Sequence, residues 1–137
     1  MKEFITNSPE ATFALGENLG KSCQGGEVIL LIGNLGAGKT CFTQGIAHGL
    51  GVKGKVSSPT FNLLKVYKIK AGVLCHIDAY RLNSGNDLIS IGLDDYLGKK
   101  DAVVVIEWAE RVKDIWPKDK IKIEFKNFKE GRKIKIY

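Results

Sequence analysis

The chain has 137 residues, a typical length for one domain, and a formal net charge of +6. Its 44% hydrophobic and 26% charged residues are those of a folded protein with an ordinary polar surface. No apolar run approaches the roughly 20 residues that span a bilayer, and the N-terminus lacks the apolar segment of a secretory signal, so we expect neither a membrane protein nor a secreted one.

The positive charge is concentrated near the C-terminus. Residues 1–110 hold 11 basic and 11 acidic side chains, whereas residues 111–137 hold 10 basic and 4 acidic ones. This segment is either a footprint for RNA or an acidic partner, or a solvated lysine-rich hairpin that only keeps the protein soluble.

Three cysteines indicate the redox compartment. Cys23, Cys41 and Cys75 are odd in number and widely spaced, and no CxxC pair occurs. This pattern predicts free, partly buried thiols in a reducing environment. We therefore expect a cytoplasmic protein, with neither a membrane nor DNA as a partner.

The hydrophobic pattern alternates between strand and helix periodicity along most of the chain. Ser8 followed by Pro9 predicts a helix start, and Gly25-Gly26 its end. In chain order, the expected elements are a strand at 2–6, a helix from 9 to the glycine pair, a strand at 27–32, a helix at 40–50, strands at 62–69 and 73–78, short helices near 87–91 and 94–97, a strand at 102–107, a helix at 109–115 stopped by Pro117, and a hairpin of 120–125 and 132–137 with its turn at Glu130-Gly131. This order predicts an α/β fold over residues 1–137: a three-layer P-loop NTPase-like domain with a mostly parallel central sheet and an antiparallel extension.

The stretch from Gly33 to Thr40 reads GNLGAGKT and fits the phosphate-binding loop pattern GxxxxGK[ST]. An apolar strand pattern precedes it and a helix pattern follows it, as such a loop requires. Its glycines let successive backbone N–H groups turn inward, and the helix N-terminus adds a partial positive charge. We expect Lys39 to reach the β- and γ-phosphates and the Thr40 hydroxyl to hold Mg²⁺. The predicted phosphate-binding residues are Gly33, Asn34, Leu35, Gly36, Ala37, Gly38, Lys39, Thr40 and Cys41.

Two carboxylates stand where apolar strands end, at the edge where open α/β sheets bind ligands. Asp78 follows residues 73–77, and Glu107 follows residues 102–106. Either could hold a metal-bound water or orient the attacking water, although a helix cap or a surface salt bridge is the alternative for each. We predict that Asp78, Glu107 and Thr40 form the metal site. Glu107 is expected to matter more for turnover, because it ends the most continuous apolar strand.

Thr60 lies in the sequence SSPTF, where nucleotide hydrolases place a switch threonine after the phosphate-loop helix. Its hydroxyl could approach Mg²⁺ and the γ-phosphate, which would make the loop sensitive to hydrolysis; a capping or turn threonine is the alternative. On the strand before Asp78, His76 is expected to be a packed, hydrogen-bonded histidine rather than a base. The two tryptophans, Trp108 and Trp116, are expected to be core or interface anchors.

ATP is the expected nucleotide. The guanine-reading tetrapeptide NKxD is absent from the sequence. A small-molecule kinase usually uses several arginines to bind its phosphate acceptor and to form its lid. This chain has only Arg81, Arg111 and Arg132, which disfavours that class.

With these residues in view, the chain resembles the bacterial TsaE (YjeE) family, small P-loop ATPases required for making threonylcarbamoyladenosine in tRNA. The matching blocks are GNLGAGKTCFTQGIAHGLG (33–51), VSSPTFNL (56–63), HIDAYRL (76–82) and IEWAER (106–111). The phosphate loop alone would be generic, whereas SSPTF together with HIDAYR and IEW is specific. Asn34 departs from the acidic residue that the family usually places after the first glycine.

The resemblance implies an ATPase that is weak alone and acts with the TsaB–TsaD complex, which modifies tRNA; contact with tRNA would be indirect, through that complex. By matching position, Lys39 and Thr40 would bind phosphate and Mg²⁺, Asp78 and Glu107 would organise the metal and water, and Trp108 would support the site or a partner surface. The resemblance also places Thr12 and Arg132 beside the nucleotide base. Two other functions stay open: a small P-loop metabolite kinase, and a nucleotide-dependent RNA-binding module that uses the basic C-terminal segment.

Overall fold

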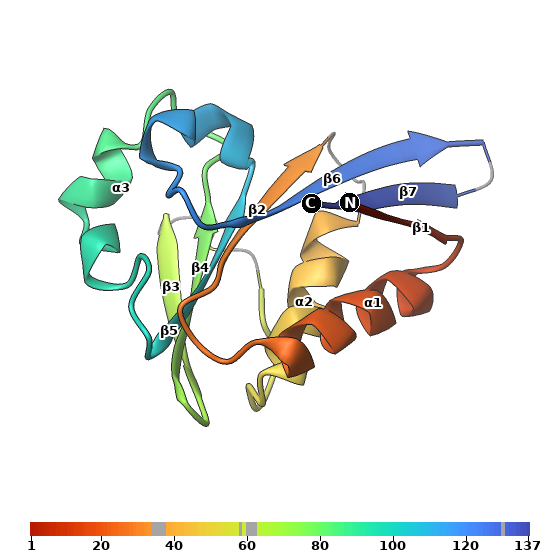
Figure 1. Cartoon of the computed structure of the whole chain (residues 1–137), viewed down its shortest axis with the longest axis horizontal. Helices are drawn as coiled ribbons and strands as arrows, with labels where there is room; N and C mark the ends of the chain where they lie inside the picture. The colour runs from red at the N-terminus through yellow and green to blue at the C-terminus, as the bar shows by residue number, and fades with distance from the viewer. Residues whose placement is uncertain (34–37, 58, 60–62, 130) are drawn as a thin grey trace.

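A seven-stranded mixed sheet organises the part of the chain that the structure describes (Figure 1). The computed structural model describes residues 1–33, 38–57, 59, 63–129 and 131–137. The strand order is β1-β7-β6-β2-β5-β4-β3. The strands are β1 (Lys2–Thr6), β2 (Val28–Gly33), β3 (Leu64–Ile69), β4 (Gly72–Asp78), β5 (Ala102–Glu107), β6 (Ile121–Phe128) and β7 (Gly131–Ile136).

The centre of the sheet is parallel and both ends are antiparallel. β2 pairs in parallel with β5 and β6, and β4 pairs in parallel with β5. Antiparallel pairs join β3 to β4, β6 to β7 and β1 to β7. The prediction of a mostly parallel centre with an antiparallel extension is therefore confirmed. The two chain ends lie side by side, because Lys2 pairs with Ile136 (Figure 1).

Helices cover both faces of the sheet, as the three-layer prediction required. Alternate residues of β2 separate into two buried clusters: Ile29 and Leu31 belong to one, and Val28 and Leu30 to the other. The first cluster lies under α2 (Lys39–Gly49), with α1 (Pro9–Ser22) packed against it. The second is covered by three short elements, α3 (Asn86–Ser90), η1 (Leu93–Asp95) and η2 (Ala109–Ile115).

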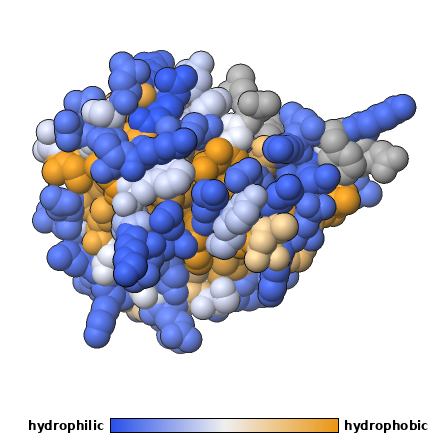
Figure 2. Space-filling model, turned by 45° about the horizontal axis from the view of Figure 1, so that its top comes forward, coloured by the Kyte–Doolittle hydropathy of each residue, from blue (hydrophilic) through white to orange (hydrophobic). Residues whose placement is uncertain are grey.

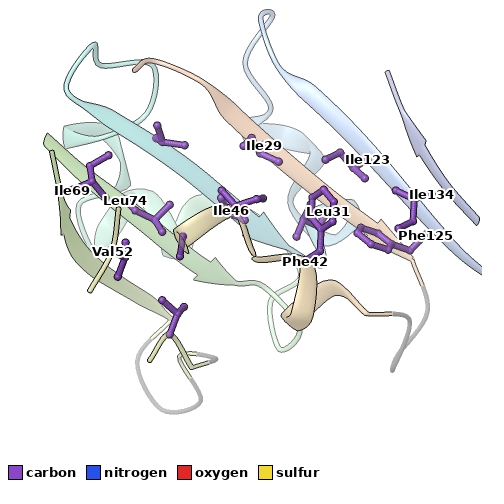
Figure 3. Packing of buried hydrophobic residues seen from close by; sticks show 14 residues of the cluster. Ile29, Leu31, Phe42, Ile46, Val52, Ile69, Leu74, Ile123, Phe125 and Ile134 are labelled. Carbon is purple, nitrogen blue, oxygen red and sulfur yellow. The ribbon is translucent and has the colours of Figure 1, made fainter. Parts of the chain in front are cut away.

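The packing of α2 on the sheet fixes where its N-terminus lies. Phe42 and Ile46 point from α2 onto the strands, among Ile29, Leu31 and Phe125 (Figure 3). The rings of Phe42 and Phe125 meet edge to face with their centroids 5.3 Å apart. Each of these side chains is almost fully buried, so α2 is held firmly against the sheet, with Thr40 of its first turn beside Glu107 at the C-terminal end of β5.

Glycines bring α1 and α2 into backbone contact. A Cβ added to Gly16 or Gly20 of α1 would lie 2.3 Å from a carbonyl oxygen of α2. A Cβ added to Gly45 or Gly49 of α2 would lie 2.2 Å from a carbonyl oxygen of α1. Contact positions rise together along the two helices, from Phe42 opposite Gly16 to Ile46 opposite Gly20. The helices are therefore parallel, and both N-termini lie at the same end.

The structure differs from the sequence predictions mainly at the ends of elements. β3 begins at Leu64 rather than at residue 62, and β6 continues to Phe128. The segment 109–115, expected to be a helix, is a 3₁₀ helix with a non-helical residue at Val112. Two tertiary contacts hold this shape: the Asp114 carboxylate accepts hydrogen bonds from the Gly85 N–H at 2.8 and 3.0 Å, and the Trp116 indole donates to the Ala109 carbonyl at 2.9 Å.

The surface is mixed rather than apolar. The face shown in Figure 2 is largely hydrophilic, with hydrophobic side chains visible between the polar ones. In the described residues, no helix is long and apolar enough to cross a membrane.

Burial raises the pKa of the Cys23 and Cys75 thiols to about 12, with Glu27 adding to the effect at Cys23, so both stay protonated and unreactive.

Candidate functional site

The register of the parallel strands brings the predicted carboxylates together. Asp78 of β4 pairs directly with Glu107 of β5 at the C-terminal ends of both strands. Because side chains alternate between faces, both lie on the face that α2 covers, and His76 lies on that face two residues earlier. The sequence argument had placed Asp78 and Glu107 at this edge without showing that they are opposite each other.

Two described glycines of the phosphate loop occupy positions that other residues would strain. Gly33 ends β2 with φ at 146°, and a Cβ there would lie 2.5 Å from the Phe125 carbonyl oxygen. Gly38 caps α2 in the left-handed region with φ at 88°. Both positions therefore favour glycine, and the first N–H groups of α2 have no acceptor within that helix.

Lys39 is a buried cation held by neutral partners. Its side chain is 5% exposed. The ammonium group donates a hydrogen bond to the Gly33 carbonyl at 2.7 Å and lies 3.4 Å from the centroid of the Trp108 ring. Burial lowers the pKa of Lys39, while Glu110, Glu107 and Asp78 oppose that shift from a distance.

Among the described residues, no carboxylate oxygen lies within 4.0 Å of this ammonium. A desolvated charge without a counter-ion is costly. An anion held at the start of α2 would offset this cost.

The two carboxylate oxygens of Glu107 contact different partners. Oε2 lies 2.5 Å from Nε2 of His76, and both side chains are almost fully buried. Oε1 accepts a long hydrogen bond of 3.5 Å from the Thr40 hydroxyl. His76 therefore fixes the carboxylate from behind and leaves Oε1 facing the first turn of α2.

Thr12 and Arg132 lie beside the phosphate loop, close to Gly38. A Cβ built on Gly38 would meet the Arg132 side chain at 3.2 Å and the Thr12 methyl group at 3.3 Å. The Thr12 hydroxyl is 2.8 Å from that of Thr6, which pairs with Arg132 across β1 and β7. The outer strands and the start of α1 thus form one wall of the site.

The Cys41 side chain is directed to α1 rather than to the loop. Its thiol donates a hydrogen bond to the Pro9 carbonyl at 3.1 Å. Burial raises the pKa of this thiol, although the nearby Arg132 opposes the shift. Any phosphate contact from this residue must therefore come from its backbone N–H, which lies in the first turn of α2.

Trp108 adopts a backbone conformation that places its ring under Lys39. It has φ at 58°, the only positive value among the described residues that are not glycine. The ring of Tyr80 lies 5.0 Å from the Trp108 ring, and the guanidinium of Arg111 lies 5.5 and 5.9 Å from the two ring centroids. Left-handed backbone at a bulky residue stores strain, a feature common at functional sites.

The structure gathers most, but not all, of the predicted site residues. Asn34, Leu35, Gly36, Ala37 and Thr60 lie outside the described residues, so their placement stays a prediction. Asp78 is half-exposed, and its carboxylate accepts a hydrogen bond from the Tyr80 N–H at 3.0 Å. The described residues that come together are Gly33, Gly38, Lys39, Thr40, Asp78, Glu107, Thr12 and Arg132.

Sequence reasoning missed three features of the site: the partner of His76, and the contributions of Glu110 and Tyr80. His76 was predicted to be packed and hydrogen-bonded, which it is, but its partner Glu107 was not foreseen. Glu110 and Tyr80 were not singled out at all. The available signal for His76 was its strand position, which shares a face with Asp78; no comparable pattern marks Glu110 or Tyr80.

The donor set fits a nucleotide with its magnesium ion. Hydroxyl and carboxylate oxygens are ligands that Mg²⁺ prefers, and Thr40 and Glu107 present them side by side. In the described ranges, no group of three or more His, Cys, Asp or Glu side chains could hold a metal ion alone. A magnesium ion would therefore depend on phosphate oxygens and water to complete its coordination, as it usually does. Buried Lys39 would supply the matching cation for those phosphates.

Comparisons with known proteins show the family to which this chain is similar. Residues 6–134 match the family described as "Threonylcarbamoyl adenosine biosynthesis protein TsaE". Two similar proteins carry the name tRNA threonylcarbamoyladenosine biosynthesis protein TsaE. The one from Treponema pallidum is 38% identical, over 94% of this chain and 94% of its own length, and the one from Aquifex aeolicus is 39% identical, over 100% and 96%. The crystal structure of Bacillus subtilis YdiB superposes with a TM-score of 0.78 at 32% identity, covering 97% of this chain and 82% of that one.

Proposed function

Because this chain belongs to the TsaE family, whose members take part in tRNA threonylcarbamoyladenosine biosynthesis, we propose that it binds and hydrolyses ATP as an accessory protein of that modification. The observation that carries the proposal is Lys39, a buried ammonium at the start of α2 whose close partners, among the described residues, are a carbonyl oxygen and a tryptophan ring. A triphosphate would provide the anion that this position lacks.

Each residue of the site has a distinct part in this proposal. The N–H groups at the start of α2 and the Lys39 ammonium bind the phosphates. Thr40 and Glu107 would hold Mg²⁺, which would neutralise charge on the β- and γ-phosphates. Asp78, opposite Glu107, orients water at the same edge. Thr12 and Arg132 bind the adenine side, where the planar guanidinium suits stacking on a base.

His76 is a positioning residue in this scheme, because it acts through Glu107. Its hydrogen bond at 2.5 Å engages one oxygen of the Glu107 carboxylate and so fixes the orientation of the other oxygen. Partners of this kind orient the groups that bind a metal and raise their effectiveness. The buried location also shields the pair from competing water.

The proposed partner is the TsaB–TsaD complex, with tRNA reached through that complex and the cytoplasm as the place of action. We propose that the complex forms with ATP and loosens with ADP, through a loop that Thr60 ties to the γ-phosphate. A tenfold preference between nucleotide states would require only about 1.4 kcal/mol of coupling. Thr60→Ala should reduce that preference.

The test is an ATPase assay with and without TsaB–TsaD and tRNA. We expect slow hydrolysis by the chain alone and faster turnover when the partner complex and tRNA are added. Affinity for the complex should be measured with ATP, ADP and a non-hydrolysable analogue. Equal affinity in all three states would exclude the switch, and transfer of phosphate to a metabolite would favour a kinase instead.

A further inference from the structure

A second basic region lies in the middle of the chain, away from the candidate site. Residues 28–77 contain six lysines and no aspartate or glutamate. One of the six is the buried Lys39. The other five are exposed: Lys53, Lys55, Lys65, Lys68 and Lys70. Within the described ranges, none of these five has a carboxylate oxygen within 4.0 Å.

The basic C-terminal segment, which the sequence analysis considered for RNA, is different. Lys122 lies 3.6 Å from Glu124, and Lys133 and Lys135 lie 4.0 and 3.9 Å from Glu3. Part of its positive charge is therefore balanced within the sheet. The 53–70 lysines keep more of their charge available for a partner.

Three of these lysines line a groove of about 610 Å³. Lys53 comes from the connection after α2, whereas Lys68 and Lys70 come from the end of β3 and the turn that follows. Val52 and Ile69, both buried, supply apolar lining, and the half-buried Tyr67 supplies an aromatic one. The groove thus combines unpaired cations with one ring.

The neighbourhood of the groove adds further donors. β3 is the outermost strand at its end of the described sheet, so its outer edge offers backbone N–H groups. Lys65 lies close to the groove, with its ammonium 5.4 Å from the centroid of the Tyr67 ring. These donors suit an extended, polyanionic ligand.

We propose that this groove binds the phosphodiester backbone of RNA. Lysines contact phosphates as flexible point charges without reading sequence. An aromatic ring beside them can stack on an unpaired base, which is how many proteins bind single-stranded RNA. A protein partner fits less well, because lysine is depleted in protein–protein interfaces. The inference rests on the proposed function only for the choice of RNA as the nucleic acid. It adds a direct contact between this chain and RNA to the contact made through the TsaB–TsaD complex.

The position of the groove separates it from nucleotide binding. Lys39 is at the first turn of α2, whereas Gly51 and Lys53 follow its last turn. The 11 residues of α2 separate its two ends by about 16 Å at 1.5 Å per residue. RNA in the groove would therefore leave the phosphate loop accessible.

The test is fluorescence anisotropy with the full chain and a labelled, unmodified tRNA transcript. The groove variant combines Lys53→Gln, Lys68→Gln and Lys70→Gln. The matched control removes the same charge from the C-terminal segment through Lys118→Gln, Lys126→Gln and Lys129→Gln, all at exposed positions. Both variants should bind ATP like the parent, which keeps this test independent of the proposed ATPase function.

We expect the groove variant to bind tRNA at least tenfold more weakly at low salt, and the control to change affinity less than twofold. Loss of three phosphate contacts should also reduce the slope of log affinity against log salt by about 2 to 3. Tyr67→Leu should weaken binding to a single-stranded oligonucleotide more than to a duplex.

Three results would overturn the inference. Equal weakening by both triple variants would mean that only net charge matters. Unchanged tRNA binding by the groove variant would mean that these lysines do not bind RNA and serve instead to keep the edge strand β3 from pairing with other chains. Weaker binding to TsaB–TsaD without any effect on tRNA would assign the groove to an acidic protein.

Discussion

Replacing His76 with glutamine, asparagine or leucine changes one contact of Glu107 in three graded ways. Glutamine can place its amide nitrogen near the position of Nε2, the atom that lies 2.5 Å from Glu107 Oε2. Asparagine is shorter and reaches only the position of Nδ1. Leucine fills similar space and donates nothing. The series therefore separates the hydrogen bond from the packing of the side chain.

The size of the effect follows from burial and charge. Removal of the donor leaves a carboxylate oxygen buried and unpaired, which costs about 2–3 kcal/mol of folding free energy. Partners that orient metal-binding groups typically contribute about 10- to 100-fold to activity. We expect the leucine and asparagine variants to lose turnover in this range and the glutamine variant to recover most of it. ATP affinity should stay within about twofold, because the Lys39 contacts are untouched.

The assay measures kcat and KM for ATP hydrolysis with TsaB–TsaD present, ATP affinity by titration calorimetry, and unfolding of each variant. His48→Leu is the control, because His48 is the exposed histidine of the chain and pairs with Glu17 on α1. The reasoning is refuted if the leucine variant turns over like the parent. It is also refuted if glutamine rescues no better than asparagine, or if KM rises while kcat is unchanged.

Three further predictions concern the phosphate loop, the carboxylates and the helix pair. Because burial lowers the pKa of Lys39, this side chain binds more protons in the unfolded chain than in the folded one, and the contribution of Lys39 to folding stability should rise as pH increases toward 10.5. Lys39→Met should remove this pH-dependent gain, which thermal melts at neutral and alkaline pH would measure. The same variant should lose the stabilisation that ATP gives to the parent. Glu107→Ala should lower turnover while ATP still binds, and normal hydrolysis by this variant beside an inactive Asp78→Ala would reverse their order. Gly16→Ala should destabilise the fold by about 1–3 kcal/mol, because its Cβ would lie 2.3 Å from the Phe42 carbonyl oxygen; Asn18→Ala, at an exposed position of the same helix, should have little effect in the same denaturant titration.

The sheet centre was predictable because its signals are local and strong. Residues 102–106 are continuously apolar and end at an acid, so β5 and Glu107 were placed correctly before any contact was known. Thr12 and Arg132 came only from the family resemblance. Their approach to Gly38 depends on β1 pairing with β7, a contact between the two ends of the chain.

Other features depend on contacts that no local pattern reveals. The 109–115 segment has helical periodicity, yet Asp114 bonds the Gly85 backbone and the segment becomes a 3₁₀ helix. Trp108 has a positive φ that a bulky residue rarely adopts, and the centroid of its ring lies 3.4 Å from the Lys39 ammonium. Tertiary contacts override local propensity at Asp114, and Trp108 with its positive φ contacts the candidate site directly.

The backbone contact between α1 and α2 has a mechanical consequence. The main chains of the two helices are in direct contact at four glycines, which leaves little room for one helix to slide past the other. We expect the two helices to move as one rigid unit. This unit is joined closely to β1, which ends at Thr6, two residues before the N-cap of α1 at Ser8. We therefore expect any displacement of α2 to carry α1 with it and so to reach β1, at the edge of the sheet where the two chain ends pair.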